Sequence, residues 1–279
     1  MKKIIAAFDG LKFSDSTLSY AITFGRENKC HIVGVFLNDM TYYSRNPYRI
    51  LIEADNNNYT TLDALEEEDA ATRNKAVEKF SAACSEAGLN YSVHKDKDIA
   101  LMELLHESTY ADLVIIDANE TFNRYAEDLP TRFIRDFLAG VQCPVLLAPK
   151  FYVPIRKSIL LYDGQPSSVY AIKMFSYLLP VLNALPSEVI TVKNSDDDLH
   201  LPDNRLMKEF MKRHQPDAAY TVLKGDAEEE ILLRLRSEDA TAVIVAGAYK
   251  RGVVSRFFRH SMVDVLMREL RWPLFIAHQ

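Results

Sequence analysis

The chain of 279 residues is poor in the features that mark several functional classes. Its three cysteines, Cys30, Cys84 and Cys143, lie far apart and form no Cys-x-x-Cys pair, so we expect free thiols rather than disulfides or a metal site. The seven histidines show no His-x-His or His-Glu-x-x-His spacing, and we expect no bound metal. No stretch approaches the length of a membrane span, so no membrane association is expected.

Positive charge is also scarce, because 39 acidic residues outnumber 33 basic ones. The net charge of -6 and the lack of a basic stripe argue against nucleic-acid binding. The apolar run after Lys3 stops at Asp9, too short for the core of a signal peptide, so we expect a cytoplasmic protein. No Gly-x-Ser-x-Gly, phosphate-loop or Cys-His pattern is present, so we assign no catalytic residue and do not expect an enzyme.

The sequence contains an internal repeat. Four segments of the first half have similar counterparts in the second half. Residues 3–10 correspond to 158–164, 91–95 to 220–224, 113–117 to 242–246, and 143–148 to 272–277. Each half has the size of an ordinary domain, and a short Pro-bounded linker over 149–157 joins them. We therefore expect two similar domains, over 1–149 and 157–279.

Within each half, short apolar runs alternate with helical patterns. Strands are expected at 2–8, 31–37, 91–94, 112–117 and 144–148, then again at 158–162, 187–192, 218–223, 241–246 and 273–277. Helices are expected after Ser14 and Ser167, which can serve as N-caps, and over 98–109 and 131–140. Val, Ile and Leu occupy both faces of the strands, which predicts an α/β fold with two doubly wound five-stranded parallel sheets.

The two halves differ in length at one place. Asp9 and Asp163 are 154 positions apart, whereas Tyr91 and Tyr220 are 129 apart, so the first half carries 25 extra residues between its first and third strands. This insertion, near 38–64, is rich in tyrosine and follows the second strand on the ligand side of the sheet. It could be a lid or a partner surface, or a variable surface insertion without either role.

In an open parallel sheet, ligands bind beyond the carboxyl ends of the strands where the strand order reverses. The loops after the first and fourth strands meet there, and the two halves differ in the second of these loops. The loop over 247–261 starts with Gly247 and contains four bases and no acid, whereas residues 117–128 contain no glycine and four acids against one base. The bases could equally form a solvated helix face, and Asp9 and Asp163 could simply brace their own loops.

These repeated segments resemble the sequences of the universal stress protein family in its tandem form. The resemblance covers both halves, nearly end to end. In ATP-binding members the loop after the fourth strand reads Gly-x2-Gly-x9-Gly-Ser/Thr. Gly247 and Ser261 match its ends, while Lys250 and His260 replace its inner glycines. In the first half Thr131 stands near the terminal Ser/Thr position.

The resemblance implies an adenine nucleotide alpha hydrolase-like fold with strand order 3-2-1-4-5. It also implies pairing of the halves through their last strands, 144–148 and 273–277. For function it implies a non-catalytic stress-response regulatory or binding protein, in which adenine nucleotide (ATP or AMP) binding is weak, single-site or lost.

Any nucleotide is expected once per chain, in the second half. The candidate contacts are Asp163, Gly164, Val192, Gly247, Lys250, Ser255, Arg256 and Ser261. Two alternatives stay open, an ATP-binding protein with slow hydrolysis or phosphotransfer in the second half, and a purely structural interaction module. A homodimer and an unidentified protein partner are further expectations.

Overall fold

The computed structural model describes residues 2–38, 62–96, 99–123, 125–193, 200–238, 241–247 and 262–278. The elements of the first half are β1 (Lys3–Asp9), α1 (Asp15–Asn28), β2 (His31–Leu37), α4 (Leu62–Glu86), β3 (Asn90–Asp96), α5 (Ala100–Ser108), β4 (Leu113–Asp117), α6 (Arg132–Gly140) and β5 (Val145–Ala148). Those of the second are β6 (Lys157–Leu161), α7 (Pro166–Leu178), the 3₁₀ helix η1 (Pro180–Ala184), β7 (Ser187–Lys193), α8 (Asn204–His214), β8 (Ala219–Lys224), α9 (Ala227–Arg236), β9 (Ala242–Gly247), α10 (Met262–Glu269) and β10 (Leu274–Ala277).

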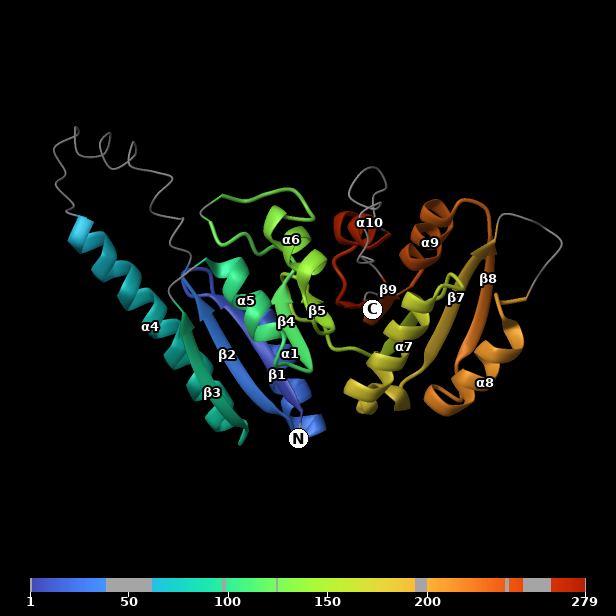
Figure 1. Cartoon of the computed structure of the whole chain (residues 1–279), viewed down its shortest axis with the longest axis horizontal. Helices are drawn as coiled ribbons and strands as arrows, with labels where there is room; N and C mark the ends of the chain where they lie inside the picture. Colours follow the sequence, from blue (N-terminus) through green and yellow to red (C-terminus); the bar gives the residue numbers. More distant parts are fainter. Residues whose placement is uncertain are drawn as a thin grey trace.

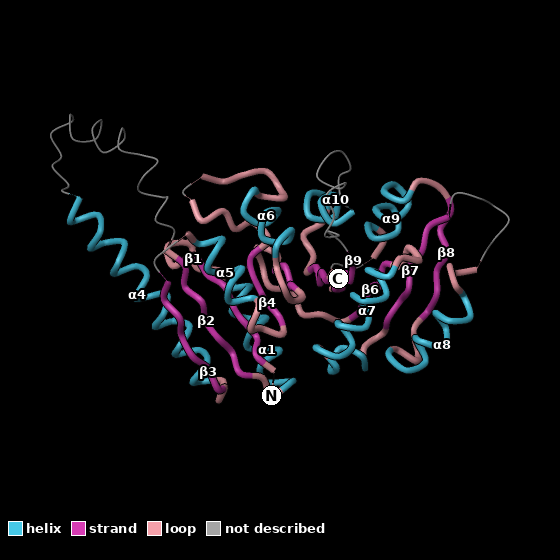
Figure 2. Tube along the Cα trace, in the orientation of Figure 1, coloured by secondary structure: helices cyan, strands magenta, loops and turns pink. Residues whose placement is uncertain are grey.

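All ten strands form one sheet in the order β3-β2-β1-β4-β5-β10-β9-β6-β7-β8 (Figures 1 and 2). Each half is parallel and has the order 3-2-1-4-5, which confirms the expected fold class. The halves meet where β5 and β10 pair antiparallel, with Leu147 opposite Leu274 and Val145 opposite Ile276. This contact pairs two strand edges that would otherwise be open and leaves β3 and β8 at the outer edges.

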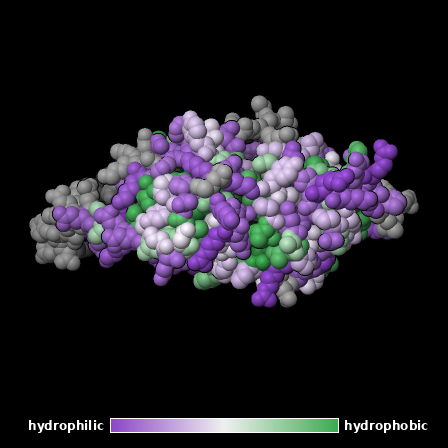
Figure 3. Space-filling model, turned by 90° about the horizontal axis from the view of Figure 1, so that it is seen from below, coloured by the Kyte–Doolittle hydropathy of each residue, from purple (hydrophilic) through white to green (hydrophobic). Residues whose placement is uncertain are grey.

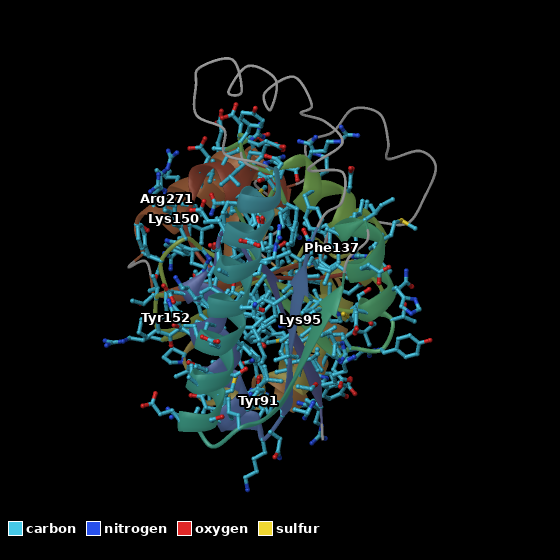
Figure 4. All side chains as sticks on the ribbon, turned by 90° about the vertical axis from the view of Figure 1, so that its left-hand side faces the viewer. Tyr91, Lys95, Phe137, Lys150, Tyr152 and Arg271 are labelled. Atoms are coloured by element: carbon cyan, nitrogen blue, oxygen red, sulfur yellow. The ribbon has the colours of Figure 1, made fainter. Side chains whose placement is uncertain are left out.

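The strands are buried on both faces because helices cover each face. Ile4, Ala6 and Phe8 of β1 belong to one core layer, and the intervening Ile5 and Ala7 belong to the other. The first layer lies under α1, α4, α7 and α8, and the second under α5, α6, α9 and α10. Figure 4 shows the two layers edge-on, with Phe137 of α6 and Tyr152 of the linker on opposite sides of the strands.

The linker between β5 and β6 packs against α1. The Tyr20 hydroxyl donates a hydrogen bond of 2.8 Å to the Val153 carbonyl, and the rings of Tyr20 and Tyr152 lie 4.8 Å apart. Burial raises the pKa of Tyr20 above its ordinary value, so its hydroxyl stays a donor. These contacts fix the linker to the first half.

Part of the length difference between the halves lies in a longer helix. Helix α4 has 25 residues, whereas its counterpart α8 has 11. The N-terminal end of α4 extends beyond the sheet (Figure 1), and Glu67 and Glu68 on it are exposed. The remainder of the expected insertion, residues 39–61, lies outside the described residues, so the lid interpretation stays a prediction.

The surface seen from below in Figure 3 is largely hydrophilic, with separate hydrophobic patches. Among the described helices none is long and apolar enough to cross a membrane. The three cysteines are free; Cys30 and Cys84 are buried, and Cys143 is half-buried.

Candidate functional site

The loops after β1 and β6 have the same local geometry. Asp9 Oδ1 accepts a hydrogen bond of 2.8 Å from the Leu11 amide, and Asp163 Oδ1 accepts one of 2.9 Å from the Gln165 amide. Both aspartates therefore brace their own turn, as one sequence interpretation allowed. They differ in exposure, because Asp9 is only 7% exposed whereas Asp163 is exposed to solvent.

Asp9 is buried because a charge cluster closes the first crevice. The Lys12 ammonium lies 3.6 Å from Asp9 Oδ2 and 3.4 Å from Glu120 Oε1, in the loop after β4. It also donates a hydrogen bond of 3.0 Å to the Thr121 hydroxyl. Lys12 thus joins the loop after β1 to the loop after β4 across the point where the strand order reverses.

The Glu120 side chain is the most enclosed member of this cluster. Its Oε1 atom accepts the backbone N–H groups of Thr121 and Phe122, each at 2.9 Å. The residue is 5% exposed. Burial, and then the nearby charge of Asp9, raise the pKa of Glu120 to about 7 against the opposing effects of Lys12 and the two N–H groups.

Two further contacts hold the same crevice. Ser14, the N-cap of α1, donates a hydrogen bond of 2.8 Å to Asp117 Oδ2 at the end of β4. Thr131, the N-cap of α6, donates one of 2.5 Å to the Glu120 carbonyl and accepts the Ile134 amide at 3.2 Å. The Thr131 hydroxyl, near the terminal Ser/Thr position of the family loop, is therefore engaged within the protein.

Arg73 of α4 also reaches the first crevice. A Cβ atom placed on Gly10 would lie 2.8 Å from Arg73 Cγ, so the arginine stem lies directly over the turn after β1. The guanidinium lies 4.0 Å from Asp69 Oδ2 on the same helix. The first crevice thus contains cations that a count over residues 117–128 does not include.

In the described part of the second crevice, the counterpart of the Ser14–Asp117 hydrogen bond is not formed. Ser168, which corresponds to Ser14, donates a hydrogen bond of 2.7 Å to Asp163 Oδ1, in its own loop. The position that corresponds to Asp117 is Ala246, which has no polar side chain. Asp163 is therefore not tied to the end of β9 by a side chain at this position.

Gly247, at the end of β9, packs directly on the start of α7. A Cβ placed there would lie 2.5 Å from the Ser167 carbonyl oxygen and 2.6 Å from the Ser168 nitrogen, both backbone atoms. The glycine is thus required by packing, whatever its role towards a ligand. Through Ser168, which contacts both, the structure brings Gly247 and Asp163 together.

The remaining candidates are placed less fully. Gly164 has φ +80°, a conformation that favours glycine, and Pro202 lies over it, while the Tyr162 hydroxyl donates 3.0 Å to the Pro202 carbonyl. Val192 lies at the end of β7, on the other side of β6 from Gly247. The four others, Lys250, Ser255, Arg256 and Ser261, lie outside the described residues.

Sequence reasoning missed Lys12 and Arg73 as members of the first crevice. Neither residue lies in the loops after the fourth strands, whose acids and bases differ between the halves. Lys12 comes from the loop after β1, and Arg73, on helix α4, precedes Asp117 by 44 residues. The spacing Asp9 to Lys12 was the one available signal, since it places an ammonium within reach of the strand-end carboxylate. Among the described residues no group of three or more His, Cys, Asp or Glu side chains could hold a metal ion.

Comparison with models of protein families finds no match, and no curated protein matches the chain. Solved structures match along its whole length. A universal stress protein from Archaeoglobus fulgidus has a TM-score of 0.70 at 14% identity, covering 99% of this chain and 98% of that one. A putative universal stress protein from Pseudomonas aeruginosa has a TM-score of 0.60 at 13% identity, with 100% and 93% covered.

A protein of unknown function from Pseudomonas aeruginosa has a TM-score of 0.61 at 12% identity, covering 100% of this chain and 92% of that one. Identities this low speak for the fold, and the fold extends over both halves and their junction. The strand order of each half and the full-length likeness agree: the chain has the tandem, two-domain fold of the universal stress proteins.

Proposed function

We propose that the protein is a non-catalytic regulatory protein of the universal stress type that binds one adenine nucleotide per chain, in its second half. The observation that carries this proposal is the unequal exposure of two equivalent aspartates. Asp9 is 7% exposed and its neighbourhood is filled by Lys12 and Glu120, whereas Asp163 is exposed. Among the described residues, the Asp163 carboxylate is therefore the more accessible of the two to a ligand.

The second crevice offers suitable chemistry for a nucleoside. An exposed carboxylate can accept hydrogen bonds from ribose hydroxyls or from an exocyclic amino group. Val192 supplies an apolar surface at the end of the neighbouring strand β7. Gly247 brings the end of β9 against the first turn of α7, and the positive end of a helix dipole favours anions.

The proposal is tested by isothermal titration with ATP and with AMP, with and without magnesium. We expect one site per chain. Asp163→Ala should weaken binding at least tenfold, because the exposed carboxylate is lost, and Asp9→Ala should change it less than twofold. Loss of binding in Asp9→Ala with retention in Asp163→Ala, or two equivalent sites per chain, would contradict the proposal.

The regulatory, non-catalytic part of the proposal has its own test. Incubation of the purified protein with ATP and magnesium should leave ATP unchanged beyond the rate of a buffer blank. Hydrolysis that disappears in Asp163→Ala would instead favour the alternative of slow hydrolysis in the second half.

A further inference from the structure

Three donors converge on one carboxylate oxygen in the first half. The Thr121 and Phe122 amides lie 2.9 Å from Glu120 Oε1, and the Lys12 ammonium lies 3.4 Å from the same atom. The Glu120 residue is only 5% exposed. The three donors therefore form a cradle around the Glu120 carboxylate, and the Asp9 carboxylate also contacts Lys12, at 3.6 Å.

The backbone of this loop is shaped for an anion. Phe122 has φ +47°, a left-handed conformation that a bulky residue rarely adopts. This turn directs two successive N–H groups to one point, the arrangement that makes anion-binding concavities in phosphate sites. The ammonium of Lys12 adds a full positive charge to the two partial ones.

The cradle also lies where ligands of such sheets bind. It follows the carboxyl end of β4, next to β1, where the strand order of the first half reverses (Figure 1). We infer that Glu120 is a built-in substitute for a bound oxyanion, and that Lys12 with the Thr121 and Phe122 amides forms a latent phosphate site that this carboxylate occupies.

The loop is held by contacts that do not involve the carboxylate. The Thr131 hydroxyl binds the Glu120 carbonyl at 2.5 Å, and Ser14 binds Asp117 at 2.8 Å. The Thr121 hydroxyl donates to the Asn123 carbonyl at 3.1 Å. Removal of the Glu120 carboxylate alone therefore leaves the two N–H groups without their acceptor, and leaves Lys12 with Asp9 as its remaining carboxylate.

This inference goes beyond the proposed function, since it concerns the first half and a simple oxyanion. Phosphate binding is measured at residues of the first crevice. The outcome is therefore independent of whether Asp163 contacts a nucleotide.

The test uses the full chain, labelled with ¹⁵N at threonine and phenylalanine, and inorganic phosphate as the probe at pH 8. Phosphate is added to about 10 mM, a concentration on the order of the dissociation constant of a weak site. In the wild type, this phosphate should leave the Thr121 and Phe122 amide resonances unmoved. In Glu120→Ala the same titration should shift both resonances with saturation. Adding Lys12→Gln to that variant should weaken the binding at least tenfold.

Asp128→Asn is the matched control, because it removes the same charge from an exposed position of the same loop. It should behave as the wild type does. Should Glu120→Ala fail to fold, Glu120→Val removes the charge and every polar atom from the cradle while filling more of the volume, and should bind phosphate at least tenfold more tightly than the wild type. A folded Glu120→Ala or Glu120→Val protein without phosphate-dependent shifts, or a wild type that binds equally well, overturns the inference.

Discussion

Lys2 donates a hydrogen bond of 2.8 Å from its ammonium to the Leu178 carbonyl, and it also contacts the Tyr177 carbonyl. Leu178 is the last residue of α7, so a residue just before β1 caps a helix of the other half. A cation at this end of a helix satisfies carbonyl groups that lack intrahelical partners and interacts favourably with the helix dipole. The halves are therefore tied at this point as well as through β5 and β10.

Removing this tie should loosen the two halves. Lys2→Gln is expected to lower the free energy of unfolding by about 1 kcal/mol, because a charged hydrogen bond to α7 is lost. The measurement is urea unfolding followed by circular dichroism. Lys212→Gln, at an exposed position of α8, is the control and should have little effect. Equal effects of the two substitutions would show that Lys2 contributes no specific contact.

Gly247→Ala should destabilise the second half strongly. The new methyl group would lie 2.5 Å from the Ser167 carbonyl oxygen, and a backbone atom cannot move aside as a flexible side chain can. We expect a loss of about 3 kcal/mol, seen as a lower thermal midpoint. Gly88→Ala is the comparison, because Gly88 has φ +65° but open space around it, and its expected cost is about 1 kcal/mol. A Gly247→Ala protein as stable as the wild type would mean that β9 and α7 separate at no cost.

Glu188 of β7 lies at the centre of a second charge network, at the opposite end of the strands from the crevice. It accepts hydrogen bonds from Lys157 at 2.7 Å, Thr221 at 2.7 Å and Arg234 at 2.8 Å, while only 4% exposed. Burial opposes its ionisation, but these hydrogen bonds and the two cations outweigh burial and lower the pKa of Glu188.

Glu188→Gln should lower the free energy of unfolding by about 2 kcal/mol at pH 7, because Lys157 and Arg234 lose one of the two carboxylates that they share and keep only Glu238. The sign of the pH dependence follows from the lowered pKa. This contribution is complete above the unfolded value of about 4.3 and is lost as pH falls through the folded value. Glu209→Gln, exposed on α8, is the control. A difference between wild type and Glu188→Gln that does not shrink in acid would contradict this account.

The raised pKa of Glu120 predicts the opposite dependence of the free energy of unfolding on pH. Between the unfolded value of about 4.3 and the folded value of about 7, the folded state binds a proton that the unfolded state does not. Stability should therefore fall as pH rises through this window, by about 4 kcal/mol at most, and Glu120→Gln should remove that part of the pH dependence. The groups whose charges act on Glu120 are Asp9 and Lys12. Unfolding curves at several pH values, compared between the two proteins, measure the difference.

Much of the fold followed from local pattern. The strand at 31–37 and the helix after Ser14 appear as predicted, because apolar runs and N-caps act over short distances. The expected cap at Ser167 is wrong: α7 begins at Pro166, and Gln165 takes the N-cap position. Proline favours the first position of a helix, so the pair Gln165-Pro166 was the better signal.

The candidate site was harder to predict because its contacts join distant positions. Glu120 and Lys12 are 108 positions apart, and no local pattern pairs them. The sequence showed four acids against one base after β4, whereas in the structure one of these acids, Glu120, is buried and lies 3.4 Å from the Lys12 ammonium of another loop. The sign of the charge at the end of a strand depends on which other loops reach it, and this is decided by the packing of the whole half.

The antiparallel junction of β5 and β10 also determines what can vary between the halves. Two identical subunits joined in this way would carry identical crevices, since any substitution would appear in both. In a duplicated chain, the short linker keeps two unlike partners together at a ratio that dilution cannot change. The residues of one crevice can then change, so that a side chain fills the place of a ligand, while the residues of the other crevice stay the same. Both crevices are still encoded by one gene.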